Sequence, residues 1–356
     1  MSHSPWPLFG TDLDQARQWL KSSWYCRPVF PQRLHWGLSL GLTKDVEQWL
    51  KANPSALSKG EQQKLNFRLQ RLTQAESPHR AFLSQEQLAK GGLILNRASE
   101  VGGALRIRLN GGIGDHLQDI ALISSWVAQQ RITVILEADG ARVNQFLRLT
   151  AELPRVQLQQ ASCRPAEHPL TSLAFEGYVR HSFPSTVYAA WLSQYRHPNT
   201  ERGPRMICCW RSRGNADKLS NYYRSVGIAE VSAFYSSIQQ QWPELCILDL
   251  TGWQPWEAAA LRQQGIQFHD PSQGDLLALM RIVEGAEVVT IDTALAHLCA
   301  CMHQSAWLLL PLFPDERWLT LRQQQHCYEQ TLKVQQQTQF GRWNHELEQL
   351  AKKIRF

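Results

Sequence analysis

The feature that most restricts the fold of this chain is an alternation of short apolar runs with longer amphipathic segments. From about residue 104, ALRIRLN alternates like a strand and ends in the glycine-rich GGIGD. HLQDIALISSWVAQQ then has helical periodicity, and ITVILEA is a short β-branched run typical of a buried parallel strand. A strand, a glycine turn, a helix and a second strand form a βαβ unit. We therefore expect an N-terminal α/β domain over residues 104–200.

The same alternation begins again after RHPNTERGPR at 196–205, whose breakers and charges indicate a linker. Four strand patterns, RMICCW, LCILDLT, EVVTI and SAWLLLP, alternate with helical patterns such as AEVSAFYSSIQQQWP and TALAHLCACMH. Strands that alternate with helices predict a second doubly wound α/β domain, over residues 205–335. The segment GRWNHELEQLAKKIRF predicts a closing helix within residues 336–356.

Residues 1–95 lack this alternation and have helical patterns throughout. TDLDQARQWLKSS opens with a capping threonine and acids in its first turn, and LTKDVEQWLKANP repeats this design. SKGEQQKLNFRLQRLTQAE has apolar residues at helical spacing on a charged background. No 34-residue repeat is visible, so we expect a helical N-terminal module rather than a repeat array.

Composition narrows the function classes. Hydrophobic residues make up 43% and charged residues 19%, as in a folded globular protein, and no apolar run is long enough to span a bilayer. The net charge of +6, from 37 basic and 31 acidic residues, favours anionic partners only weakly, and no basic run of the nucleic-acid-binding kind occurs. We expect no nucleic-acid partner. Peripheral contact with anionic lipid headgroups stays open, as do phosphorylated substrates.

The cysteines and the first residues bear on the compartment. MSHSPWPLFGTDLDQ has no basic region followed by an apolar core, so it does not resemble a secretory signal. The eight cysteines are scattered, and the C-x-C of Cys299 and Cys301 has no partner pair at zinc-site spacing. We expect buried free thiols, a cytoplasmic protein and no metal site.

Two turns between strand and helix are candidate ligand sites, because ligands of open α/β sheets bind at the carboxyl ends of strands. In the first, NGGIGDH, Gly112 and Gly114 fit a dinucleotide fingerprint, but Leu117 occupies the place of its last glycine, and no P-loop lysine follows. What remains is a glycine turn that carries Asp115 near a helix start. Asp115 is either a helix cap or a catalytic carboxylate, and the sequence leaves both open.

The second turn follows the apolar run of VVTIDTALAHL. A helix start offers free backbone N–H groups and a positive dipole end, which suit a phosphate. Asp292, Thr293 and Ala294 form this turn, and His297 lies on the same helical face as Thr293, one turn along. A histidine within an apolar helix is also compatible with a core residue that has a hydrogen-bond partner.

A third candidate is the polar loop WRSRGNADKLSNYYRS, which contains the one lysine between Lys90 and Lys333. Four cations lie in it or at its ends and together would suit a diphosphate, unless they only form a solvated basic loop. They are Arg211, Arg213, Lys218 and Arg224.

These residues resemble a known family. IRLNGGIGDHLQDIALISSW is similar to the N-terminal "GD" turn and helix of glycosyltransferase family 9, the ADP-heptose:lipopolysaccharide heptosyltransferase family. VVTIDTALAHLCACMHQSAWLLLPLFPDERWL resembles its D-[ST]-x-x-x-H-L-A turn, and is closer still to relatives often fused to tetratricopeptide repeats. The resemblance covers about residues 104–330. In this chain CACMHQSA replaces the small, glycine-containing helix end of those relatives.

The resemblance implies a GT-B fold, in which two Rossmann-like domains face a cleft. It implies an inverting, metal-independent transfer of a hexose or heptose, without a cofactor, from a nucleotide diphosphate-sugar to a saccharide, glycolipid or protein acceptor. Asp115 would be the catalytic base. The substrate-binding residues would be Gly112, Gly114, Lys218, Arg211, Arg213, Asp292, Thr293, Ala294 and His297.

Two other functions fit parts of the pattern. A non-catalytic GT-B-like protein would bind the nucleotide sugar or act as a scaffold without turnover. An oxidoreductase of the NAD type would use the same Rossmann scaffold, but the broken glycine spacing disfavours it.

Overall fold

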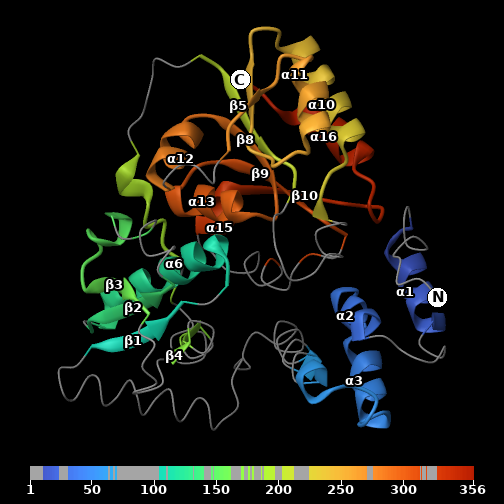
Figure 1. The fold of residues 1–356 in the computed structure, drawn as a ribbon, viewed down its shortest axis with the longest axis vertical. Coiled ribbons are helices and arrows are strands. Elements are labelled where there is room, and N and C mark those ends of the chain that lie inside the picture. Colours follow the sequence, from blue (N-terminus) through green and yellow to red (C-terminus); the bar gives the residue numbers. More distant parts are fainter. Residues whose placement is uncertain are drawn as a thin grey trace.

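The computed structural model describes these residues: 11–23, 31–62, 65–66, 69, 104–109, 111–130, 132–139, 146, 148–161, 170–171, 175–176, 179, 186, 188–196, 203–211, 224–270, 276–312, 314, 318 and 327–356. They contain two separate parallel β-sheets with their helices and a set of helices near the N-terminus (Figure 1). The α/β class predicted from the alternation is therefore correct. The domain boundaries stay predictions, because much of the chain between the units lies outside the described residues.

The first sheet has the strand order β3-β2-β1-β4, and all its pairs are parallel. Its strands are β1 (Leu105–Arg108), β2 (Val134–Ala138), β3 (Val156–Gln160) and β4 (Leu170–Thr171). Helix α6 (Ile113–Gln130) connects β1 to β2 and buries Leu117, Ile120, Ile123 and Trp126 in a core that includes residues of these strands. This is the βαβ unit that the sequence predicted.

The second sheet has the order β10-β9-β8-β5-β6-β7, again with parallel pairs. Its strands are β5 (Arg205–Cys209), β6 (Cys246–Asp249), β7 (Gln267–Phe268), β8 (Glu287–Ile291), β9 (Ala306–Leu310) and β10 (Leu332–Gln336). The helices of this unit are α10 (Ile228–Gln241), α11 (Pro255–Arg262), α12 (Leu276–Val283), α13 (Ala294–Met302), α15 (Cys327–Thr331) and α16 (Asn344–Lys353). Strands β5, β6, β8 and β9 and the closing helix lie where the sequence patterns predicted them, whereas the two outer strands, β7 and β10, were not predicted.

The two faces of the second sheet border different cores because successive strand side chains point to opposite faces. Met206 and Cys208 of β5 belong to a core shared with α10 and α16, whereas Ile207 belongs to a core that includes α12 and α13. The core on the α13 side continues without a break into the first unit through α6. The two α/β units are therefore packed together, with α6 and α13 side by side between the sheets (Figure 1).

Residues 188–196 strengthen this contact between the units. Their backbone includes the short 3-10 helix η2 (Ser193–Tyr195), and they contact both helices. The Leu192 N–H donates to the Cys301 carbonyl at 2.9 Å, and Trp191 Nε1 donates to the Leu117 carbonyl at 3.3 Å. One short segment is thus bound to α13 and to α6 at once.

Helices α1 (Leu13–Ser23), α2 (Pro31–Ser39) and α3 (Thr43–Ala52) form a third core. That core also contains Leu312 and Phe340, which follow β9 and β10, and the Phe340 N–H donates to the Thr11 carbonyl at 3.0 Å. The N-terminal helices therefore pack on loops at the carboxyl edge of the second sheet. Whether all of residues 1–95 belong to one helical module stays a prediction, because residues 70–103 lie outside the described chain.

The cysteines in the described residues are present as thiols. The two in α13, Cys299 and Cys301, are deeply buried. Burial raises the pKa of Cys299 to about 12, so this thiol stays protonated at neutral pH. Within the described residues, no group of three or more His, Cys, Asp or Glu side chains could hold a metal ion. In the same part of the chain, no helix is long and apolar enough to cross a membrane.

Candidate functional site

Each sheet reverses its strand order at one of the two predicted turns. In the first sheet β1 lies between β2 and β4, so the strand order reverses at β1, which leads into the Gly111–Asp115 turn. In the second sheet the order reverses between β5 and β8, and β8 leads directly into Asp292 and Thr293. These reversal points are where ligands of open α/β sheets bind. The two turns predicted from the sequence therefore lie at the strand-order reversal points of the two sheets.

The two turns contact each other at a glycine. A Cβ atom placed on Gly114, near the start of α6, would lie 2.7 Å from His297 Cδ2 and 3.3 Å from Ala294 Cα. Both distances are shorter than ordinary contacts, so α6 and α13 approach this closely only because residue 114 has no side chain. Three of the predicted site residues, from turns far apart in the chain, thus meet at one point.

The first glycine turn is shaped around Asp115. The Gly112 N–H donates to Asp115 Oδ2 at 2.6 Å, which is the return contact of a capping box at the start of α6. Gly111 has φ +94°, and a Cβ atom there would overlap the Asp115 carboxylate. Asp115 therefore acts as a helix cap, and its carboxylate is half-buried at the mouth of the turn.

The second turn starts α13 with its own cap. Thr293 is the N-cap residue, and its side chain accepts from the Leu295 N–H at 3.3 Å. Its hydroxyl also lies 3.0 Å from that of Thr290, which is buried in β8. The prediction that Thr293 begins a helix is confirmed. Thr293 and Ala294 are partly exposed, so the first turn of α13 reaches the surface.

His297 lies beneath this surface, with 2% of the residue exposed. Its Nδ1 is 2.9 Å from the Tyr328 hydroxyl, and its ring lies 5.0 Å from the Trp318 ring and against Gly114. This geometry is that of a buried histidine with a hydrogen-bond partner, the alternative that the sequence left open. A ligand on the first turn of α13 would lie above the imidazole.

Asp292 forms a buried ion pair at the same turn. Arg224 Nη1 lies 2.9 Å from Asp292 Oδ2, and the two side chains are 19% and 7% exposed. Arg224 follows the polar loop after β5, so the pair spans the point where the second sheet reverses its strand order.

Arg211, the other cation of the polar loop that the structure describes, does not join this pair. Arg211 donates to both oxygens of Glu257, at 2.7 and 2.6 Å, and lies over the Trp253 ring at 4.2 Å. Burial tends to raise the pKa of Glu257, but the hydrogen bonds and charge of Arg211 outweigh it and lower that pKa. Arg211 is thus bound to residues that follow β6. Arg213 and Lys218 lie outside the described residues.

Sequence reasoning missed a buried carboxylate at the end of β6. Asp249 accepts from the Tyr235 hydroxyl at 2.8 Å, Trp253 Nε1 at 2.9 Å and the Thr251 N–H at 2.7 Å. Burial raises its pKa, and these donors oppose the increase. The signal in the sequence that could have identified Asp249 was its position near the end of the apolar run LCILDLT. This network fixes the loop on which Arg211 rests.

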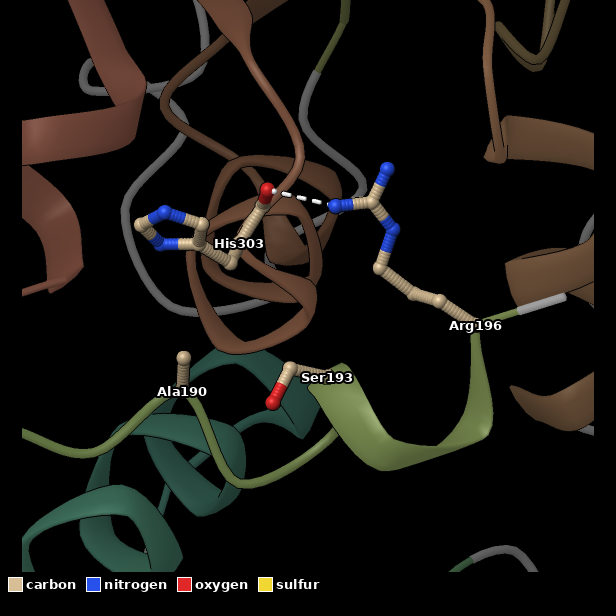
Figure 2. Close-up of a pocket in the computed structure, with 4 residues that line it drawn as sticks. All are labelled: Ala190, Ser193, Arg196 and His303. Atoms are coloured by element: carbon tan, nitrogen blue, oxygen red, sulfur yellow. Dashed lines mark hydrogen bonds between the residues drawn. The ribbon is translucent and has the colours of Figure 1, made fainter. Parts of the chain in front are cut away.

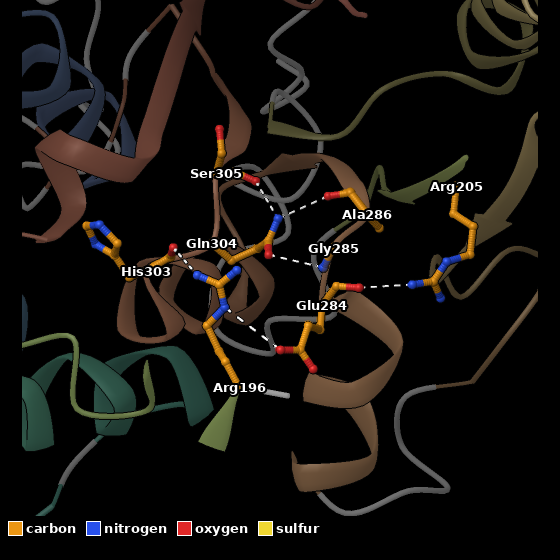
Figure 3. Close-up of polar contacts among 8 residues, drawn as sticks. All are labelled: Arg196, Arg205, Glu284, Gly285, Ala286, His303, Gln304 and Ser305. Carbon is orange, nitrogen blue, oxygen red and sulfur yellow. Dashed lines mark hydrogen bonds and ion pairs between the residues drawn. The ribbon is translucent and has the colours of Figure 1, made fainter. Parts of the chain in front are cut away.

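A pocket of about 360 Å³ lies at the opposite end of α13 from these turns (Figure 2). Ala190, Ser193, Arg196 and His303 line it. Arg196 Nη1 donates to the His303 carbonyl at 3.0 Å, and its Nε lies 3.9 Å from Glu284 Oε1 (Figure 3). The pocket thus lies between residues 188–196 and the C-terminal end of α13, and none of the predicted site residues lines it.

Comparison with known proteins gives structural neighbours only. No protein-family model and no curated protein match the sequence. E. coli heptosyltransferase WaaC with ADP is 12% identical with a TM-score of 0.47, and the match covers 70% of this chain and 97% of that one. E. coli ADP-heptose lps heptosyltransferase II is 10% identical with a TM-score of 0.45, over 70% of this chain and 99% of that one. S. aureus MnaA with UDP is 9% identical with a TM-score of 0.34, over 81% and 76%.

The strand order and the two turns are enough to define the structural class of the protein, and the structural neighbours are not needed for it. The protein is an α/β protein with two parallel sheets, whose strand-order reversal points face each other across α6 and α13. The residues at those points are therefore the ones from which a function can be inferred.

Proposed function

We propose that this protein is a GT-B-type glycosyltransferase. In this proposal it moves a sugar from a nucleotide diphosphate-sugar to a saccharide, glycolipid or protein acceptor, with inversion and without a metal. The observation that carries the proposal is the contact of Gly114 with Ala294 and His297. It brings the ligand-binding ends of two parallel sheets together, as a reaction between a donor on one unit and an acceptor on the other requires.

The donor diphosphate would lie on the first turn of α13, beside Asp292, Thr293 and Ala294. Backbone N–H groups at a helix start and the positive dipole end favour an anion there. The start of α6 with Gly112 and Gly114 meets the same place, so two positive helix ends converge. Negative charge that develops on the leaving nucleotide diphosphate would be stabilised by this arrangement, to which Lys218, Arg211 and Arg213 would add cations.

Asp115 would be the general base that removes the proton from the acceptor hydroxyl. Its carboxylate is half-buried at the mouth of the first turn and held by the Gly112 N–H, so it has a fixed position. Because an oxygen of an asparagine side chain also accepts from that N–H, Asp115→Asn should keep the cap. A positioned base contributes about 10²–10⁴ in rate.

The test has two stages. Thermal-shift measurements with a panel of nucleotide diphosphates and their sugars first identify the donor, because a ligand that binds the native state raises the melting temperature. Transfer with that donor should then fall at least about a hundredfold in Asp115→Asn, with donor affinity and melting temperature unchanged. Asp139→Asn, an exposed carboxylate after β2, is the matched control and should keep full activity. Failure of every nucleotide to bind would reject the donor site, and an active Asp115→Asn variant would reject the base.

A non-catalytic nucleotide-sugar-binding or scaffold protein is the second candidate. It is favoured by the burial of His297 and by the capping role of Asp115, since both residues have structural partners. Donor binding without transfer or hydrolysis by the purified protein would identify this function.

A further inference from the structure

The buried ion pair at the second turn is unusual in where its cation lies. Arg224 is held 2.9 Å from Asp292, and Asp292 directly precedes the N-cap of α13. A carboxylate is favourable at a helix N-terminus, but a guanidinium is not, because it faces the positive end of the dipole. The start of α6 brings a second positive helix end to the same place through Gly114. The cation therefore adds positive charge where two helix ends already supply it.

Stability does not account for this placement. Burying two charges costs several kcal/mol per ion in desolvation, and such pairs are often no more stabilising than apolar residues of the same volume. The positive end of the α13 dipole would favour the Asp292 carboxylate at this position without a cation beside it. The arrangement becomes favourable when an anion with two or more charges lies against the turn. The negative charge of that anion then offsets the positive charge of both helix ends and of the guanidinium.

From this geometry we infer that Arg224 binds the phosphates of the ligand and that Asp292 is a positioning residue, which holds the guanidinium at the start of α13. The inference rests on the proposed function, because it specifies how the diphosphate of that same site is bound. A planar guanidinium suits phosphate oxygens, and a carboxylate partner fixes its direction before the ligand arrives. Arg224, which lies within the described residues, thereby places a cation at the turn itself.

If Asp292 positions Arg224, replacing Asp292 should change anion binding in the direction opposite to the one expected from charge alone. Removing a carboxylate beside a phosphate site should tighten the binding of an anion, because one repulsion is lost. If Asp292 instead positions Arg224, Asp292→Asn should weaken binding in the wild-type background. In an Arg224→Gln background there is no guanidinium to position, so the same change should leave binding unchanged or tighten it.

Calorimetry on the full chain at fixed salt would measure this, with ADP, UDP and inorganic pyrophosphate as probes. Arg224→Gln should weaken binding at least about tenfold, the usual scale for a charge-assisted bond. Asp292→Asn should weaken it several-fold, and only when Arg224 is present. Arg106→Gln is the control, because it removes a partner from another 2.9 Å pair with a buried acid, Glu137, in the first sheet. That variant should bind like the wild type.

The outcomes separate this inference from the proposed function. If the wild type binds none of the three probes, both are rejected. If it binds them and Arg224→Gln binds equally well, or Asp292→Asn tightens binding in both backgrounds, only the phosphate-binding role of Arg224 and the positioning role of Asp292 are rejected. Should Arg224→Gln not fold, Arg224→Lys keeps the charge but loses the planar fork, and its affinity should fall between the wild type and background binding.

Discussion

The close approach of α6 and α13 predicts that Gly114→Ala destabilises the protein. Alanine normally stabilises a helix relative to glycine, by about 0.5–1 kcal/mol. At Gly114, however, the new methyl group would lie 2.7 Å from His297 Cδ2, about 0.7 Å short of the 3.4 Å at which ordinary contact begins. The imidazole has little room to move, because Trp318 and Tyr328 enclose its other sides. Forcing a methyl group into such a contact typically costs about 1–3 kcal/mol, so the free energy of unfolding should fall despite the better helix propensity.

Urea denaturation followed by tryptophan fluorescence would measure the change. Gly112→Ala is the matched control, since its Cβ atom would meet only the Asp115 carboxylate, at an ordinary 3.5 Å. In the His297→Ala background the largest clash is removed, so Gly114→Ala should cost clearly less there than in the wild type. If Gly114→Ala is as stable as the wild type, or if His297→Ala gives no relief, the two turns do not meet as described.

Two further predictions concern stability. His303 has φ +55° at the C-terminal cap of α13, where a residue with a side chain is strained. His303→Gly should therefore raise the free energy of unfolding by about 0.5–1 kcal/mol. His303→Ala should give no gain in the same urea titration. The lowered pKa of Glu257 means that its bond with Arg211 stabilises the fold above the unfolded pKa and is lost as pH falls through the folded one. Between about pH 5 and pH 3 the stability of Glu257→Gln should therefore decline less steeply than that of the wild type, and an equal slope would contradict this coupling.

Strands and turns were predictable because their signals are local. A buried parallel strand is a short apolar run, and β5, β6, β8 and β9 coincide with such runs. The Thr293 cap follows from a hydroxyl residue between a strand and a helix, and the structure has it at that position. The two turns at the reversal points were likewise found from strand ends alone.

The roles of the side chains were harder to predict, because they depend on residues distant in sequence. His297 is buried by Trp318, Tyr328 and Gly114, and no local pattern specifies those neighbours. The arginines of the polar loop looked equivalent in the sequence. Arg211 and Arg224 nevertheless pair with acids that follow different strands, Glu257 after β6 and Asp292 after β8.

The core shared by the N-terminal helices with Leu312 and Phe340 has a consequence for the order of folding. During synthesis α1, α2 and α3 emerge first, but the two residues that complete their core emerge only after both sheets are nearly complete. Contacts between such distant parts of a chain form late, because the intervening segment must first be ordered. Until then the core that contains Leu20 and Leu34 lacks two of its members, Leu312 and Phe340. Helices α1, α2 and α3 therefore reach their final packing only after the strands that precede Leu312 and Phe340 have formed.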